Sequence, residues 1–127
     1  MYFLAKLRGV IVILGIILAS EALGSDLASQ HKVCISTPAG KAYETIATKT
    51  FWSNLAFMFE CAPPTDPIPE PIQIYYKVGL DGTIIEMSMQ PDNEVANCIK
   101  RHVSKRIFPK PPNGKTWVGD IFLRFSQ

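Results

Sequence analysis

Apolar and polar residues alternate from residue 72 to residue 80, and this alternation predicts a β-strand with one buried face. The apolar positions are Ile72, Ile74, Tyr76, Val78 and Leu80, and the positions facing away are Gln73, Tyr75 and Lys77. Asp81-Gly82 follows and is typical of a tight hairpin turn, whose central residues need positive φ. Residues 83–89 should return as a second strand, with Ile85, Met87 and Met89 toward the core.

Residues 41–61 contain neither glycine nor proline, and apolar side chains recur there at helical spacing. We predict a helix from about Ala42 to Glu60. Thr37-Pro38-Ala39-Gly40 stands before it as a break in the pattern. Ser25 to Ala39 is polar and mixed, which indicates a short extended piece or a loose arm.

A second helical stripe follows Pro91. Its members lie at i, i+3, i+4, i+7 and i+8 and are Val95, Cys98, Ile99, His102 and Val103. Asp92 is expected as the N-cap, and Glu94 falls in the first turn, where the helix dipole favours an acid. Basic residues lie at the C-terminal end of this helix, where the helix dipole favours cations: Lys100, Arg101, Lys105 and Arg106.

Proline-rich segments separate these elements. Residues 62–71 (APPTDPIPEP) hold too many prolines for a helix or a sheet, and we expect a polyproline-like strap there. Phe108-Pro109 should end the second helix, because the residue before a proline is pushed out of the helical region. Phe108 is expected to anchor this corner in the core, and Asn113-Gly114 makes a further turn.

Residues 116–125 predict a last strand. One face carries Trp117, Ile121, Leu123 and Phe125, and the other carries Val118, Asp120, Phe122 and Arg124. The element order is then helix, strand, strand, helix, strand. A right-handed crossover with only antiparallel neighbours places the last strand beside the first. We therefore predict an α+β fold: a small antiparallel three-stranded sheet of order 2-1-3, with two helices on one face.

The N-terminal residues have the pattern of a secretory signal peptide. Met1 to Arg8 is basic, Val10 to Ala19 (VIVILGIILA) is apolar, and small residues follow at Ala22 and Gly24. The apolar run is about half of the ~20 residues that span a bilayer, so an uncleaved anchor is the lesser alternative. We predict a signal peptide at 1–24, an arm at 25–41 and a domain at 42–127, in a periplasmic protein.

Composition and candidate chemistry argue against an enzyme. A net charge of +2 with 19% charged residues is too balanced for a nucleic-acid-binding surface. The sequence has no phosphate-binding glycine loop and no zinc-binding spacing, so no cofactor or metal is expected. His102 should be structural. His31 and Cys34 could form a nucleophilic pair, but a nucleophile needs a base held by a third group.

A binding role has better support. The last strand should lie at a sheet edge, where its backbone groups could accept another strand. The sheet face away from the helices mixes aromatic and charged side chains: Tyr75, Lys77, Ile84, Glu86, Val118, Asp120, Phe122 and Arg124. The expected partner is an envelope protein, or a second copy through the last strand. The alternatives are a structural subunit of an envelope transport or secretion assembly, and a small exported enzyme or inhibitor that uses the Cys34 arm.

The segments YYKVGLDGTIIEMSM and NEVANCIKRHVSKRIFPKPPNG, followed by a terminal strand, resemble the TonB C-terminal domain superfamily. The closest branch is the AgmX/PglI C-terminal domain, and the resemblance covers about Tyr43 to Phe125. The shared motifs are Asp81-Gly82, Cys98, Phe108-Pro109-Lys110-Pro111 and Gly114. The resemblance implies the fold and the envelope compartment. The retained anchor and long spacer of an energy transducer are missing, which argues against energy transduction.

The cysteines carry a further expectation. Three cysteines in an exported chain indicate one disulfide and one leftover thiol. The resemblance implies that Cys61 pairs with Cys98, because that branch has a helix ending in Cys before the first strand. Cys34 would then be the leftover thiol, and the rival pairing is Cys34–Cys61. Ala62 and Ile107 depart from the branch, which often has Tyr and Trp at these positions.

Overall fold

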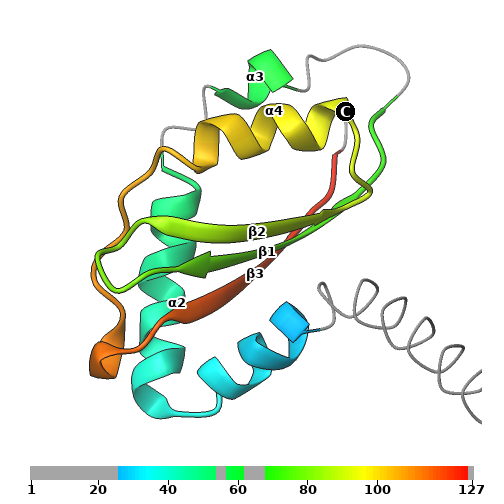
Figure 1. Cartoon of the computed structure of the whole chain (residues 1–127). Helices are drawn as coiled ribbons and strands as arrows, with labels where there is room; N and C mark the ends of the chain where they lie inside the picture. The colour runs from blue at the N-terminus through cyan, green and yellow to red at the C-terminus, as the bar shows by residue number, and fades with distance from the viewer. Residues whose placement is uncertain (1–25, 54–56, 62–67, 126–127) are drawn as a thin grey trace, which may run out of the picture.

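The computed structural model describes residues 26–53, 57–61 and 68–125 (Figure 1). The predicted signal peptide and residues 62–67 of the predicted strap lie outside the described residues. Residues 68–71, the rest of the strap, are neither helix nor strand. Within the described residues, no helix is long and apolar enough to cross a membrane.

The sheet has the predicted order. Strands β1 (Ile72–Val78), β2 (Ile84–Gln90) and β3 (Trp117–Leu123) form an antiparallel sheet of order β2-β1-β3. The alternation along β1 is confirmed, since every second residue from Ile72 to Val78 is buried. Leu80 does not continue this face: it lies in the turn and is 57% exposed.

A β-bulge corrects the facing predicted for β2. Val78 pairs with Ile84 and Lys77 pairs with Glu86, so Ile85 is the extra residue. Ile84 therefore packs against the core, and Ile85 is 57% exposed. The predictions that Ile85 faces the core and that Ile84 faces away are wrong. The extra residue at Ile85 shifts by one position the alternation of buried and exposed side chains along β2.

Helices α2 (Pro38–Phe51) and α4 (Glu94–Val103) cover one face of the sheet, as predicted, and their buried residues belong to a single core cluster with alternate strand residues. From α2 these are Tyr43, Ala47 and Phe51, and from α4 they are Ala96, Ile99 and Val103. In Figure 1, α2 passes behind the strands and α4 lies along the top of the sheet. Phe108 is buried in the same cluster, which confirms its predicted role as an anchor.

Helix α2 differs from its prediction at both ends. The Thr37 hydroxyl accepts a hydrogen bond from the Gly40 N–H at 3.0 Å, and Pro38 occupies the first turn, where a missing N–H costs nothing. The TPAG motif is thus the start of the helix and not a break before it. The helix ends at Phe51, and a separate short helix, α3 (Phe57–Cys61), follows.

The predicted arm is the largest correction. Residues 26–34 form a helix, and residues 38–41 belong to α2 (Figure 1). Leu27 and His31 are buried although neither belongs to the main core cluster. The His31 ring lies at the outer edge of β3, 6.4 Å from the ring of Tyr75, whose side chain is on the sheet face opposite α2 and α4. A helix therefore covers part of the sheet face that was expected to be open.

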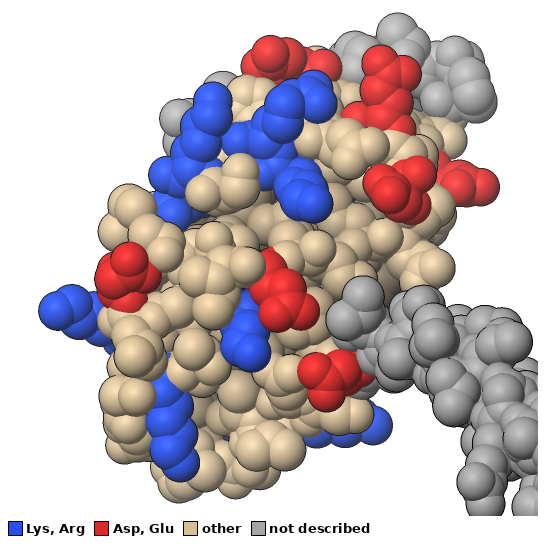
Figure 2. All heavy atoms as spheres, viewed as in Figure 1, with Lys and Arg blue, Asp and Glu red and all other residues tan. Residues whose placement is uncertain are grey.

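Helix α4 is capped by Asn93 and not by Asp92. The Asn93 side-chain oxygen accepts a hydrogen bond from the Ala96 N–H at 2.8 Å. Glu94 occupies the first turn, and the last turn is basic, as predicted. Figure 2 shows blue Lys and Arg side chains gathered over α4 and the chain that leaves it. This charge distribution complements the helix dipole.

Candidate functional site

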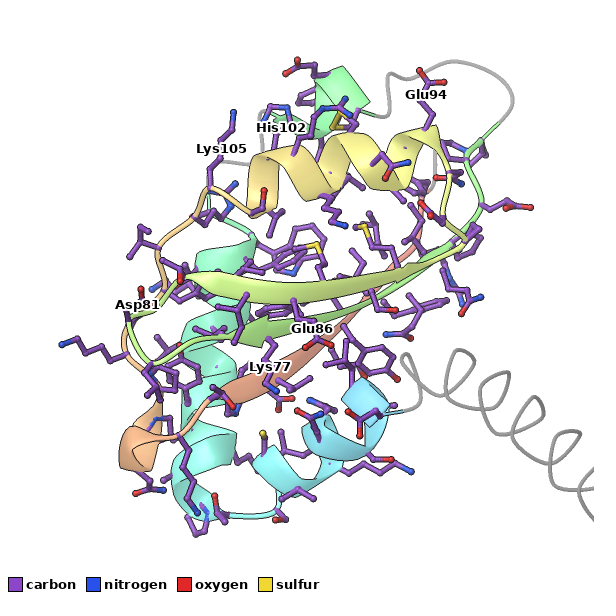
Figure 3. The ribbon with its side chains drawn as sticks, viewed as in Figure 1. Lys77, Asp81, Glu86, Glu94, His102 and Lys105 are labelled. Atoms are coloured by element: carbon purple, nitrogen blue, oxygen red, sulfur yellow. A yellow bond between two sulfur atoms is a disulfide. The ribbon has the colours of Figure 1, made fainter. Side chains whose placement is uncertain are left out.

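The strand register places most of the predicted partner-binding residues on one sheet face. Tyr75 lies opposite Asp120, and Lys77 lies between Val118 on β3 and Glu86 on β2. Figure 3 labels Lys77 and Glu86 on the side of the sheet that faces residues 26–34. Arg124 lies just after β3, with its guanidinium carbon 5.7 Å from the centre of the Phe122 ring. The structure thus brings these side chains together.

One of them is not available to a partner. Val118 is 1% exposed because residues 26–34 pack over this part of the face. Its two backbone polar groups are also occupied. Its N–H donates to the Cys34 sulfur at 3.4 Å, and its carbonyl oxygen lies 2.9 Å from His31 Nδ1. A carbonyl oxygen can only accept, so His31 carries its proton on Nδ1 in this contact.

These two contacts determine which groups of β3 point outward. Backbone groups in an antiparallel strand point alternately toward and away from the neighbouring strand. The Val118 groups bond to residues 31 and 34, so they point away from β1, and the groups of Asp120 and Phe122 point the same way. The backbone hydrogen bonds of the described residues outside regular ladders do not include these two residues. Among the residues that the structure describes, the outer edge of β3 is thus capped at Val118 and has no such partner at Asp120 and Phe122.

The open part of the edge carries exposed side chains. Phe122 is 54% exposed, and Asp120 and Arg124 are also exposed. The Gln73 amide holds this region in register, because it donates to the Asp120 carboxylate and to the Ile121 carbonyl oxygen. Burial, together with the nearby charge of Asp120, raises the pKa of Tyr75, so its hydroxyl stays neutral at physiological pH.

A second candidate site surrounds Cys34. A groove of about 690 Å³ lies between the helix of residues 26–34, the β1–β2 turn and the segment before β3. Its apolar lining comes from Val33, Leu80 and Trp117, and the Cys34 thiol is free. The two ring nitrogens of His31 face other groups. Its Nδ1 contacts the Val118 carbonyl, and its Nε2 faces the carboxylates of Glu44 and Asp120 at 3.7 and 3.9 Å.

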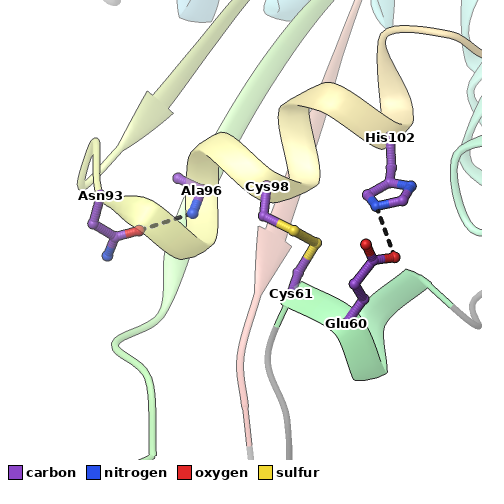
Figure 4. Close-up of a disulfide and its surroundings, with 6 residues drawn as sticks. All are labelled: Glu60, Cys61, Asn93, Ala96, Cys98 and His102. Atoms are coloured by element: carbon purple, nitrogen blue, oxygen red, sulfur yellow. Dashed lines mark hydrogen bonds and ion pairs between the residues drawn. A yellow bond between two sulfur atoms is a disulfide. The ribbon is translucent and has the colours of Figure 1, made fainter.

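The third candidate site joins α3 to α4. Cys61 and Cys98 form a disulfide, which confirms the pairing implied by the family resemblance and excludes the rival Cys34–Cys61 bridge. His102 and Glu60 lie beside it, with Nε2 and Oε2 3.2 Å apart (Figure 4). His102 thus contacts the Glu60 carboxylate, and its structural role stays a prediction.

Comparisons with protein-family models, with curated proteins and with solved structures find no match for this chain. The TonB-like resemblance therefore remains a prediction, while the α+β fold with strand order β2-β1-β3 is shown by the structure. The capping residues of β3 were missed in the sequence. Leu27, His31 and Cys34 lie at i, i+4 and i+7, which is the spacing of one helix face. The polar histidine in the middle interrupts the apolar pattern from which a helix would be predicted.

Proposed function

We propose that this chain is an exported protein-binding module that takes up an extended segment of an envelope protein along β3. The observation that carries the proposal is the outer edge of β3: within the described part of the chain it is capped at Val118 and has no backbone partner at Asp120 and Phe122. Strand addition needs such outward N–H and C=O groups. A partner strand would gain main-chain hydrogen bonds from the open part only.

The opposite edge of the sheet is a weaker candidate. The bulge at Ile85 interrupts β2, and bulges are a common means of preventing strand pairing at an edge. The open part of β3 also lies next to Phe122 and Arg124, which are residue types enriched in protein interfaces. Export is supported by the basic and apolar N-terminal sequence and by the disulfide, because disulfides persist in oxidising compartments.

In-cell photocrosslinking tests the proposal. A photoreactive residue at position 122 should crosslink to one discrete protein. The matched control is position 85, which has nearly the same exposure, 57% against 54%, but lies on the bulged edge. A crosslinking pattern that is the same from both positions would contradict the proposal. A crosslink to a second copy alone would replace the envelope partner with self-pairing.

Two substitutions at Phe122 distinguish the contribution of the backbone N–H to partner binding from that of the side chain. Phe122→Pro removes an outward N–H that does not bond to β1, and proline is tolerated at such edge positions. Phe122→Ala removes the ring but keeps the N–H. We expect Phe122→Pro to abolish partner capture and Phe122→Ala to weaken it. Equal binding by Phe122→Pro and Phe122→Ala would show that main-chain pairing is not the mode of recognition.

A further inference from the structure

Three potential metal ligands meet where α3 packs on α4, and the Glu60 carboxylate lies beside one of them, His102. Cys98 and His102 are one helical turn apart on α4, and Glu60 and Cys61 are neighbours on α3. The ligand atoms of Cys61, Cys98 and His102 all lie within 4.8 Å of one another. Glu60 Oε2 lies 3.2 Å from His102 Nε2, so its carboxylate is next to the imidazole and could join these three ligands by a rotation of its exposed side chain (Figure 4).

The spacing suits a tetrahedral ion. Zinc binds imidazole nitrogen and carboxylate oxygen at about 2.0 Å, which puts two such ligands about 3.3 Å apart at the tetrahedral angle. The observed separation between Glu60 and His102 is 3.2 Å. Two zinc-bound thiolates stand about 3.8 Å apart by the same geometry, with Zn–S bonds near 2.3 Å. The Cα atoms of Cys61 and Cys98 are 5.4 Å apart, so rotation of the two side chains could supply that separation.

We propose that reduction of the Cys61–Cys98 disulfide converts this cluster into a zinc site made by Glu60, Cys61, Cys98 and His102. A dithiol reductant transfers two electrons and two protons to the disulfide and is itself oxidised to a disulfide. Zn²⁺ then displaces the two thiol protons and binds both thiolates, with no change in its own oxidation state. Exchange with a disulfide oxidant, which takes up two electrons and two protons and becomes a dithiol, restores the Cys61–Cys98 bond and releases Zn²⁺.

The ligand set and its accessibility favour zinc. Two thiolates, one imidazole and one carboxylate are the N, S and O ligands that zinc takes in proteins, whereas magnesium and calcium prefer oxygen alone. The Glu60 side chain is 70% exposed and that of His102 is 34% exposed, which gives an ion a path from solvent. The ion would connect α3 to α4 as the disulfide does, so the same two helices stay linked in either redox state.

Zinc titration of the reduced chain tests the site. The Cys34→Ser variant is used throughout, so that the remaining thiol cannot bind metal. After anaerobic reduction with a phosphine and its removal, competition with a colorimetric chelator should show one Zn²⁺ per chain. Co²⁺ in place of zinc should give tetrahedral visible bands and thiolate charge-transfer absorption. The oxidised chain should bind neither ion at this site.

Variants identify the ligands. Loss of a direct ligand in His102→Ala should lower zinc affinity by at least the roughly 10–100-fold seen for outer-shell partners. Glu60→Gln should also weaken binding, while the matched control Glu86→Gln, at an exposed acid on β2, should not. Zinc affinity unchanged in His102→Ala, or less than one ion bound per reduced chain, would overturn the proposal. So would loss of the near-UV circular dichroism of the aromatic core on zinc binding, because the ion would then hold an unfolded chain.

Discussion

Tyr43 shows how one buried side chain connects distant parts of the sequence. It lies on α2, its ring meets Trp117 of β3 at a centroid distance of 5.0 Å, and its hydroxyl donates to the Pro109 carbonyl oxygen at 2.5 Å. Burial raises the pKa of Tyr43 from 10.0 to about 12. The neutral hydroxyl is therefore the form that the folded protein favours.

This shift predicts how stability depends on alkaline pH. Between about pH 10 and pH 12 the unfolded chain loses the Tyr43 proton while the folded chain retains it. The free energy of unfolding should therefore fall as pH rises through this window, because the folded state then binds more protons. Below pH 10 this contribution is fully present.

The Tyr43→Phe variant checks this prediction. Loss of the hydrogen bond to Pro109 should lower the free energy of unfolding by about 1 kcal/mol at neutral pH. The decline between pH 10 and pH 12 should become shallower, although Tyr76, whose pKa burial also raises, keeps part of it. Urea denaturation at a series of pH values measures both effects. The same decline in the variant and the parent would contradict the assignment.

At the scale of elements, helix α4 depends on its N-cap. The Asn93 side chain satisfies the Ala96 N–H, and Asp92 makes no such contact among the hydrogen bonds of the described residues. We expect Asn93→Ala to lower the free energy of unfolding by about 1 kcal/mol. Asp92→Ala, the matched control, should change it by less than about 0.5 kcal/mol, as surface substitutions usually do. Equal losses of unfolding free energy in Asn93→Ala and Asp92→Ala would contradict the assignment of Asn93 as the N-cap.

The elements also show how far the sequence could predict this fold. Periodicity predicted the three strands and α4, and the preference for a right-handed crossover between antiparallel neighbours predicted the strand order. The start of α2 differs from the prediction because Pro38 and Gly40 interrupt the helical pattern in the sequence, although proline is favourable in the first turn. The β2 bulge could not be predicted, because Ile84 and Ile85 are equally apolar and only the pairing with β1 distinguishes them.

The candidate site was less predictable than the fold. The pattern gave the correct sheet face for most of its residues, since alternation along β3 decides which side chains share a face. It could not show that residues 26–34 fold back over Val118, because that contact joins segments far apart in the chain. The exposed part of the predicted face therefore lacks Val118 and includes Phe122.

At the scale of the whole molecule, the disulfide is the main covalent constraint. It joins α3 to α4 across a sequence separation of 37 residues. Closing a loop of this size stabilises a protein by roughly 3–4 kcal/mol, mainly by restricting the unfolded chain. The double variant Cys61→Ser, Cys98→Ser should lose that much in urea denaturation with a metal chelator present. Cys34→Ser, which breaks no bridge, is the control; a loss below about 1 kcal/mol in the double variant would contradict the prediction.

The strand order has a consequence for the time course of folding. β1 is central, and its two neighbours are reached at very different distances along the chain: β2 follows after a short turn, whereas β3 comes after α4 and the proline-rich exit. The β1–β2 hairpin can form in microseconds, but closing the longer loop to β3 is slower. A chain emerging N-terminus first from a ribosome or a translocation channel therefore leaves one side of its central strand unpaired until β3 has emerged.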